Sequence, residues 1–128
     1  MLAKHNPDTI AAAFSSYSLA VEAPAQARWL HVSGQVGVAP DGALAEGPEA
    51  QMETAFRNVL AILNSAGMGP HDLVKLTVFL TRPEDVGRYR QVRDRMLAGA
   101  TPASTLLVVA ALADPDWLVE IEAIAAAA

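Results

Sequence analysis

The sequence predicts a single α+β domain, residues 1–128, in which two helices pack on one face of a mixed sheet. Two observations carry this prediction. Several short segments alternate between apolar and polar residues, and two longer segments repeat their apolar residues every three or four positions. The expected order is two strands, a helix, a strand, a helix and two strands. The chain has no internal repeat and no linker that would divide it into two units.

Two strands are expected before the first helix, at residues 17–22 and 28–38. One face of the second strand carries Trp29, His31 and Ser33. Gly34 and Gly37 interrupt this strand, which indicates a bulge or a close approach of another part of the backbone.

The clearest helix covers residues 49–66, and Gly67 provides its C-terminal cap. A second helix is expected at about 83–97, with Thr81 as its N-cap and Glu84 completing a capping box. Its apolar side consists of Val86, Tyr89, Val92, Met96 and Leu97. Its other side consists of Arg88, Arg90, Arg93 and Arg95, most simply a solvated face.

Three further strands complete the predicted sheet. The alternation in "DLVKLTVFLT", residues 72–81, predicts a half-buried strand. Residues 104–112 are apolar on both faces, which is typical of a strand buried on both sides. The last strand is "WLVEIEAIA", residues 117–125. One of its faces carries Leu118, Glu120, Glu122 and Ile124.

Composition and charge exclude several classes of protein. The net charge is −5 and the basic residues are scattered, which disfavours nucleic-acid binding. Residues classed as hydrophobic make up 52% of this small chain, which predicts a homo-oligomer. Without cysteine there is no disulfide and no thiolate nucleophile or metal ligand. No apolar run is long enough to span a membrane, so we expect a soluble cytoplasmic protein.

The glutamates of the last strand are the first candidates for chemistry, because a carboxylate on an apolar strand costs free energy unless it is hydrated, paired or protonated. Glu120 could be a general acid or base, but a solvated edge strand or an ion pair between subunits is the simpler interpretation. His5, His31 and His71 lack the spacing of metal ligands, so no metal site is expected. His31 could share a pocket with Ser33, although a packed or surface histidine is simpler. No phosphate loop or dinucleotide fingerprint is present.

Six segments together resemble the RidA/YjgF/YER057c/UK114 family, and they occur in that family's order across nearly the whole chain. The segments are "YSLAVE", "VSGQVGVAPDGAL", "AFRNVLAILNSAG", "DLVKLTVFL", "PAST" and "LVEIEAIA". The resemblance implies a chorismate-mutase-like fold and a homotrimer with a barrel-like core and small-molecule clefts between subunits. It also implies hydrolysis of enamine/imine intermediates such as 2-aminoacrylate, without metal or organic cofactor. An older family name is endoribonuclease, which the acidic charge does not support.

The family's site residues transfer to this sequence one at a time. Its cleft tyrosine matches Tyr17, and its water-activating glutamate matches Glu120. Its strand serine and glycine match Ser33 and Gly34, and Arg90 stands where the family has a cleft asparagine. These correspondences make Glu120 and Tyr17 the expected catalytic residues.

The largest departure from the family lies in "PAST", where deaminating members have Pro-Ala-Arg and this chain has Ser104. An arginine fork binds a substrate carboxylate through two parallel hydrogen bonds, which no serine can do. The first hypothesis is therefore an enamine/imine hydrolase acting on a substrate other than 2-aminoacrylate. In it, Ser104 and Thr105 contact the substrate and Arg90 supplies a charge from a new direction. The second hypothesis is a non-catalytic, metabolite-binding or regulatory trimer.

Overall fold

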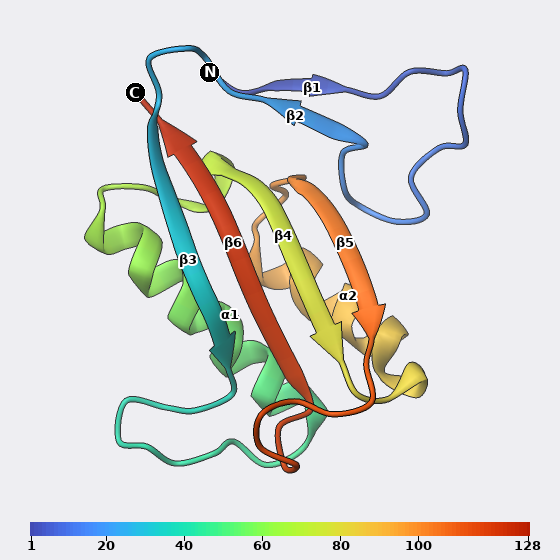
Figure 1. Ribbon diagram of the computed structural model, residues 1–128, viewed down its shortest axis with the longest axis vertical. Coiled ribbons are helices and arrows are strands. Elements are labelled where there is room, and N and C mark those ends of the chain that lie inside the picture. Colours follow the sequence, from blue (N-terminus) through green and yellow to red (C-terminus); the bar gives the residue numbers. More distant parts are fainter.

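The computed structural model describes residues 1–128 as a four-stranded mixed sheet with both long helices on one of its faces (Figure 1). The sheet runs in the order β3-β6-β4-β5, and a short antiparallel pair, β1-β2, lies apart from it. The strands are β1 (Ala3–His5), β2 (Ala20–Glu22), β3 (Arg28–Val36), β4 (Leu73–Leu80), β5 (Ala103–Val108) and β6 (Val119–Ala127). The helices are α1 (Pro48–Ser65) and α2 (Val86–Met96), with short 3-10 turns η1 (Pro70–Asp72) and η2 (Pro83–Asp85) before β4 and α2.

Connections between the elements explain the mixed sheet. β4 and β5 are parallel and are joined by α2, because parallel neighbours need a long crossover connection. β6 lies between β3 and β4 and is antiparallel to both. The predicted α+β class, the mixed sheet and the two helices on one face are confirmed.

The core lies between the helices and the sheet. α1 contributes Ala55, Phe56, Val59 and Leu63, all fully buried. The facing side of β6 contributes Val119, Ile121, Ala123 and Ala125, so its other face necessarily carries the two glutamates. Each large apolar side chain buried here stabilises the fold by about 1.5–3 kcal/mol. The opposite face of the sheet is covered by no helix, and we call it the open face (Figure 1).

Two predicted strands are shorter than expected by three residues or more. The strand expected at 17–22 begins only at Ala20, because Ser18 bonds instead to the chain before β5: its amide donates to Pro102 O and its hydroxyl to Thr101 O. The strand expected at 104–112 ends at Val108. Its predicted burial on both sides is wrong for the single chain, because β5 is an edge strand paired only with β4 and leaves Val108 45% exposed.

The start of the second helix also differs from the prediction. Regular α-helix begins only at Val86, after the η2 turn, and the expected Thr81–Glu84 capping box does not form. Instead, Arg82 donates two hydrogen bonds, of 2.8 and 3.0 Å, to the carboxylate of buried Asp85. Neither α1 nor α2 has the length and apolar character needed to cross a bilayer.

Candidate functional site

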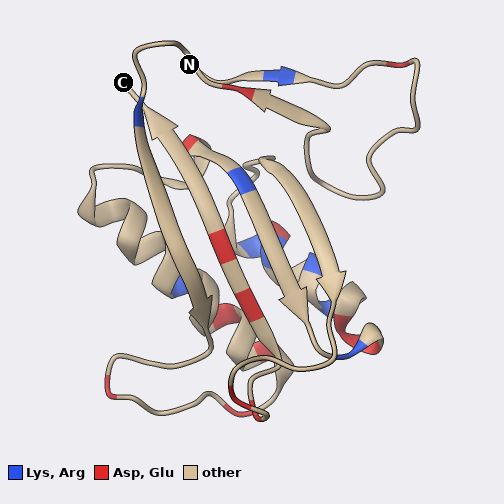
Figure 2. Ribbon diagram, in the orientation of Figure 1, with Lys and Arg blue, Asp and Glu red and all other residues tan.

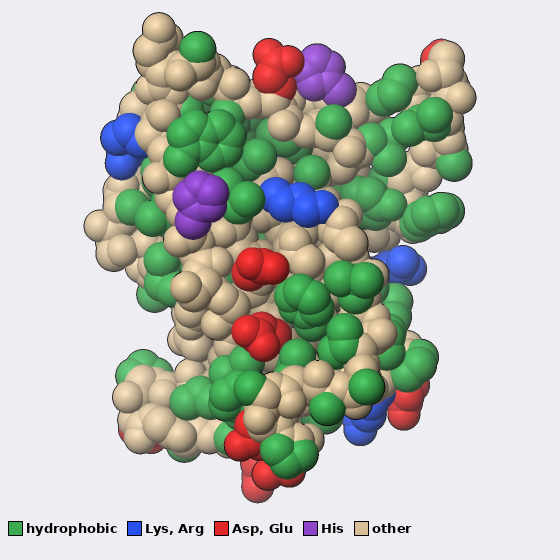
Figure 3. Space-filling model, viewed as in Figure 1, with side chains coloured by type: hydrophobic (Ala, Val, Ile, Leu, Met, Phe, Trp, Pro, Cys, Tyr) green, Lys and Arg blue, Asp and Glu red, His purple; other side chains and the backbone are tan.

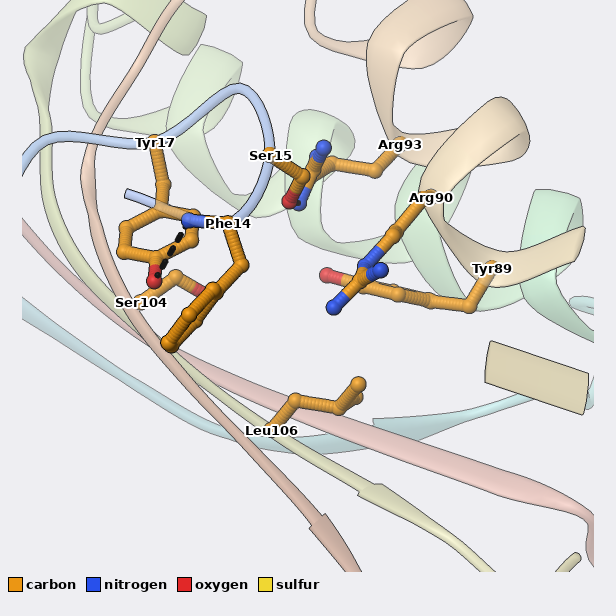
Figure 4. A pocket seen from close by; sticks show the side chains of 8 residues that line it. All are labelled: Phe14, Ser15, Tyr17, Tyr89, Arg90, Arg93, Ser104 and Leu106. Atoms are coloured by element: carbon orange, nitrogen blue, oxygen red, sulfur yellow. Dashed lines mark hydrogen bonds between the residues drawn. The ribbon is translucent and has the colours of Figure 1, made fainter. Parts of the chain in front are cut away.

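Polar side chains gather in two places, on opposite faces of the sheet. The first is a cavity of about 210 Å³ between α2, β5 and the N-terminal segment, which we call the helix-side cavity (Figure 4). Its walls are Phe14, Ser15, Tyr17, Tyr89, Arg90, Arg93, Ser104 and Leu106. The second is the pair of glutamates on the open face. Each place holds some of the residues that the sequence predicts as site residues.

The N-terminal segment is fixed beside β5 by the two hydrogen bonds of Ser18 and by a parallel bridge between Ser18 and Ala103. These contacts bring Tyr17 next to Ser104 (Figure 4). The Tyr17 hydroxyl accepts a hydrogen bond from the Phe14 amide over 3.2 Å. Its own proton therefore remains free to be donated to a ligand.

Helix α2 supplies two arginines from the opposite wall. Arg93 is only 3% exposed, and its guanidinium donates to Asp94 Oδ1 over 2.8 and 3.0 Å and to Ser15 Oγ over 3.2 Å. Arg90 is half-buried, and its guanidinium makes no hydrogen bond or ion pair within the chain. The interpretation of the α2 arginines as one solvated face is therefore wrong for Arg93.

Tyr89 forms the floor of the cavity between the helix and the sheet. Its ring stacks on Phe56 with centroids 5.8 Å apart, and the Arg93 guanidinium carbon lies 5.9 Å from its centroid. Its hydroxyl is fully buried and has no hydrogen-bond partner. Burial raises the pKa of Tyr89 well above its ordinary value, so the group stays protonated.

The open face carries Glu120 and Glu122, the two acidic bands on β6 in Figure 2. Across the strands, Glu120 lies opposite Val36 and Phe79, and Glu122 lies opposite Thr77. Neither carboxylate makes an ion pair or accepts a hydrogen bond from a side chain. In the space-filling view, acidic side chains stand in the middle of this face, next to apolar side chains and below a basic one (Figure 3).

Gly34 lies directly under the Glu120 carboxylate. The pairing of β3 with β6 shifts register between Val32 and Gln35, which confirms the bulge expected around Gly34. A Cβ at position 34 would overlap the Glu120 carboxylate, so a glycine is needed for the carboxylate to lie there. Ser33, in the same bulge, is exposed.

The predicted site residues thus fall into two groups in the single chain. Tyr17, Arg90 and Ser104 meet in the helix-side cavity. Glu120 and Gly34 meet on the open face. Thr105 faces away from Ser104, and its hydroxyl accepts a hydrogen bond from Lys75 over 2.6 Å.

Two residues of the cavity, Tyr89 and Arg93, are not singled out by the sequence. The sequence predicts Tyr89 on the apolar side of its helix. This is correct for the buried ring, but the prediction says nothing about the hydroxyl. For Arg93 a signal exists: it follows Tyr89 by four positions and Val86 by seven, which is the spacing of a buried helix stripe. No group of three or more histidine, aspartate or glutamate side chains is placed to hold a metal ion.

The sequence matches the family model described as Endoribonuclease L-PSP over residues 7–127. It is similar to the 2-iminobutanoate/2-iminopropanoate deaminase of Mus musculus, with 37% identity over 116 residues, 89% of this chain and 83% of that protein. The fold is similar to that of YyfB from Yersinia pestis, a Rid-family protein of unknown function. Their TM-score is 0.85 and their identity 31%, over 98% of both chains. It is also similar to E. coli TdcF, solved with bound serine, with a TM-score of 0.75 and 28% identity over 91% of both chains.

Proposed function

The chain belongs to the Endoribonuclease L-PSP family, and we propose that it hydrolyses a small enamine/imine intermediate other than 2-aminoacrylate. The observation that carries the proposal is the Glu120 carboxylate, which no group of the chain neutralises and which lies over a glycine. A relative with imine deaminase activity by name supports the same reaction class.

In the proposed reaction, the enamine first tautomerises to an imine, and water then adds to the C=N carbon. Glu120 accepts a proton from the attacking water, which forms a carbinolamine, and returns that proton to the nitrogen. The hydroxyl proton of the carbinolamine is then transferred to the nitrogen as the C–N bond breaks, so ammonia leaves and a carbonyl product remains. A positioned general acid–base contributes typically about 10²–10⁴-fold to such a rate. No redox partner is required.

Tyr17 and Ser33 have complementary parts in the proposal. The Tyr17 hydroxyl already accepts a hydrogen bond from the Phe14 amide, so it acts toward the substrate as a donor. Ser33, with Gly34, supplies polar contacts next to the carboxylate. Ser104 lines the cavity where deaminating relatives carry an arginine, and it contacts the substrate through its hydroxyl.

The proposal requires a second copy of the chain, because Glu120 and Tyr17 lie on opposite faces of the sheet. We propose a homotrimer in which the open face of one subunit meets the cavity edge of the next. Exposed apolar side chains support this assembly: Trp29 on β3 is 51% exposed, and Leu107 and Val108 on the edge strand are 42% and 45% exposed. Thr105 would then face a neighbouring subunit.

A non-catalytic metabolite-binding or regulatory trimer is the second candidate. Ser104 is the observation in its favour. A protein that binds a metabolite without hydrolysing it does not need the arginine with which deaminating relatives bind the carboxylate of their substrate. An RNA-cleaving activity has the family description in its favour but not the charge: the chain carries −5, and two unpaired glutamates occupy its open face.

Hydrolysis is tested with a panel of imines released by an amino-acid oxidase, together with neutral enamines, by following ammonia release. We expect faster hydrolysis of at least one of them, and a loss of about 10²-fold or more with Glu120→Gln. Glu122→Gln is the matched control, since it removes a second carboxylate from the same face of β6 and should leave the rate unchanged. If no compound is hydrolysed faster than without protein, the binding trimer is the better assignment.

A further inference from the structure

Two charged side chains have no partner in the chain, although both are half-buried. Arg90 points from α2 into the helix-side cavity, and its guanidinium makes no hydrogen bond or ion pair (Figure 4). Glu120 lies on the open face, and its carboxylate has no side-chain partner either (Figure 2). A charge that is partly removed from water costs free energy unless an opposite charge faces it. Both groups therefore point to a counter-charge supplied from outside the chain.

The neighbouring charged side chains on the same two elements differ from this pair. Glu122, two positions further along β6, is exposed, so water can hydrate its carboxylate. The other arginines of α2 are exposed or form ion pairs. On α2 and β6, partial burial without a partner is therefore confined to Arg90 and Glu120.

Arg90 and Glu120 lie at the same level of the sheet, on its opposite faces. Leu106 on β5 lines the cavity with Arg90 and lies opposite Val78 on β4. The next residue of β4, Phe79, lies opposite Glu120. If the threefold axis of the proposed homotrimer runs along the strands, the rotation keeps this level. It then brings Glu120 of one copy to the cavity that holds Arg90 in the next.

The edge of the sheet beside the cavity favours a second copy of the chain as the covering surface. β5 pairs only with β4 and leaves Leu107 and Val108 exposed, while Leu106 faces the cavity. A surface that covers these two exposed side chains also reaches the cavity next to them. The open face is acidic around Glu120, and Arg90 offers the opposite charge, so the two surfaces are complementary.

We propose that Arg90 of one subunit forms an ion pair with Glu120 of its neighbour, and that the site between them binds a ligand without a carboxylate. The guanidinium donates two parallel hydrogen bonds to the carboxylate, whose remaining lone pairs can still accept a proton from water. This inference rests on the proposed function and deepens it. The substrate is an enamine or imine that carries no negative charge.

The charge balance of the assembled site supports the choice of a neutral ligand. No carboxylate of the same chain lines the cavity, and Arg90 is its only cation without a partner. Once Glu120 pairs with Arg90, the side chains left for a ligand are the hydroxyls of Ser15, Tyr17 and Ser104. Hydroxyls donate hydrogen bonds but do not neutralise a charge. A ligand carboxylate would lose its hydration without gaining a cation and would lie beside the negative charge of Glu120.

Subunit association tests the ion pair without any turnover. Analytical ultracentrifugation measures dissociation of the assembly for Arg90→Gln, Glu120→Gln and the double variant. We expect each single variant to weaken association by about tenfold or more, because it leaves the other charge without a partner. The double variant should lose less than the two single effects combined, since the two groups interact. Arg88→Gln is the matched control, because Arg88 is an exposed arginine on the same helix and should change nothing.

Binding of pyruvate and of its neutral amide, pyruvamide, tests the class of ligand. The two probes share a carbon skeleton and differ in charge, and NMR titration of the full-length protein measures both affinities. We expect pyruvamide to bind about threefold to tenfold more tightly than pyruvate. Glu120→Gln should strengthen pyruvate binding by about tenfold or more, because it frees Arg90 to bind an anion. Adding Arg90→Gln should abolish that gain, whereas Glu122→Gln alone should leave both affinities unchanged.

Several outcomes contradict the inference. A chain that stays monomeric, or additive losses of association, would overturn the ion pair. A gain of pyruvate binding in Glu120→Gln that persists after Arg90→Gln would do the same, because it would come from lost repulsion alone. Tighter binding of pyruvate than of pyruvamide by the unmodified protein, or no binding of either probe, would reject the neutral-ligand class.

Failure of the ion pair and failure of the proposed hydrolase give different results. Coupled effects of Arg90→Gln and Glu120→Gln on association, without imine hydrolysis, would sustain the ion pair while the hydrolase fails. Imine hydrolysis that depends on Glu120, without any coupling to Arg90, would sustain the hydrolase while the ion pair fails.

Discussion

The helix-side cavity and the open face are built in different ways, although they share one sheet. In the cavity, Tyr89 and Arg93 are buried to within 1% and 3% exposure and are held by stacking and hydrogen bonds that continue into the core. On the open face, Glu120 has no side-chain partner, and strand register and the absence of a side chain at Gly34 set its position.

This difference separates the residues that maintain the fold from those that can change without unfolding the chain. A side chain whose contacts continue into the core cannot be removed without destabilising the chain, since packing and buried hydrogen bonds go with it. A side chain on an uncovered sheet face makes few packing contacts or buried hydrogen bonds, so its removal costs little stability. Substitutions on the open face should therefore alter activity alone, and substitutions of the α2 wall should alter both activity and stability.

The largest effect on activity without an effect on the fold is expected from Gly34→Ala. The new methyl group overlaps the end of the Glu120 side chain, which is flexible and moves aside, so the fold survives but the carboxylate is misplaced. A displacement of about 1 Å can cost about 10²-fold in rate. The measurement is ammonia release from the best imine of the panel, together with a thermal midpoint.

Gly87→Ala is the control for that substitution. Gly87 lies in α2, and a Cβ there meets no atom within 4 Å, so this variant should keep full activity and gain up to about 1 kcal/mol of helix stability. Wild-type turnover by Gly34→Ala would show that the position of Glu120 over residue 34 has no part in the reaction.

The next largest effect is a loss of stability in Arg93→Ala. This variant removes hydrogen bonds to Asp94 and Ser15 and the contact with the Tyr89 ring, which we expect to cost about 2–3 kcal/mol. Arg95→Ala on the same helix removes a half-exposed pair with Glu53 and should cost only about 0–1 kcal/mol. Urea denaturation measures both losses of unfolding free energy, and equal losses would show that the buried contacts of Arg93 stabilise the fold no more than an exposed pair does.

The smallest effect is expected from Ser104→Arg, which restores the residue found in deaminating relatives. We expect hydrolysis of 2-aminoacrylate to rise by about threefold to tenfold, because the new fork adds hydrogen bonds to the carboxylate but also lies near the positive charge of Arg90. In the Arg90→Gln background the gain should be larger. The matched variant is Thr105→Arg, which points toward the open face and should give no gain.

Much of the fold could be predicted from the sequence, because hydrophobic periodicity reports which face of each element is buried. The helix expected at 49–66 is α1, and the last strand places Glu120 and Glu122 on one face as expected. The errors lie where local pattern competes with long-range contact. Apolar residues after 104 predicted a strand buried on both sides, yet β5 is an edge strand with Leu107 and Val108 exposed.

The candidate site was predicted less completely than the fold. The resemblance to the family proposed Glu120, Gly34, Tyr17 and Ser104 as site residues by motif, and their roles stay predictions. It did not locate the Tyr89 hydroxyl or buried Arg93, since both depart from the expected roles of their helix faces. A buried donor without an acceptor can be recognised only when every surrounding atom has been placed.

The sequence by itself determined the family, the order of the elements and the shared face of the two glutamates, because strand and helix periods act over a few neighbouring residues. Only the tertiary structure decided that Tyr17 faces Ser104. That contact depends on the hydrogen bond of Ser18 to Thr101, 83 residues further along the chain. It also decided that Arg90 is unpaired while Arg93 is paired, although both are arginines on the same helix. Charge balance in a cavity depends on which side chains converge there, and local sequence does not encode that convergence.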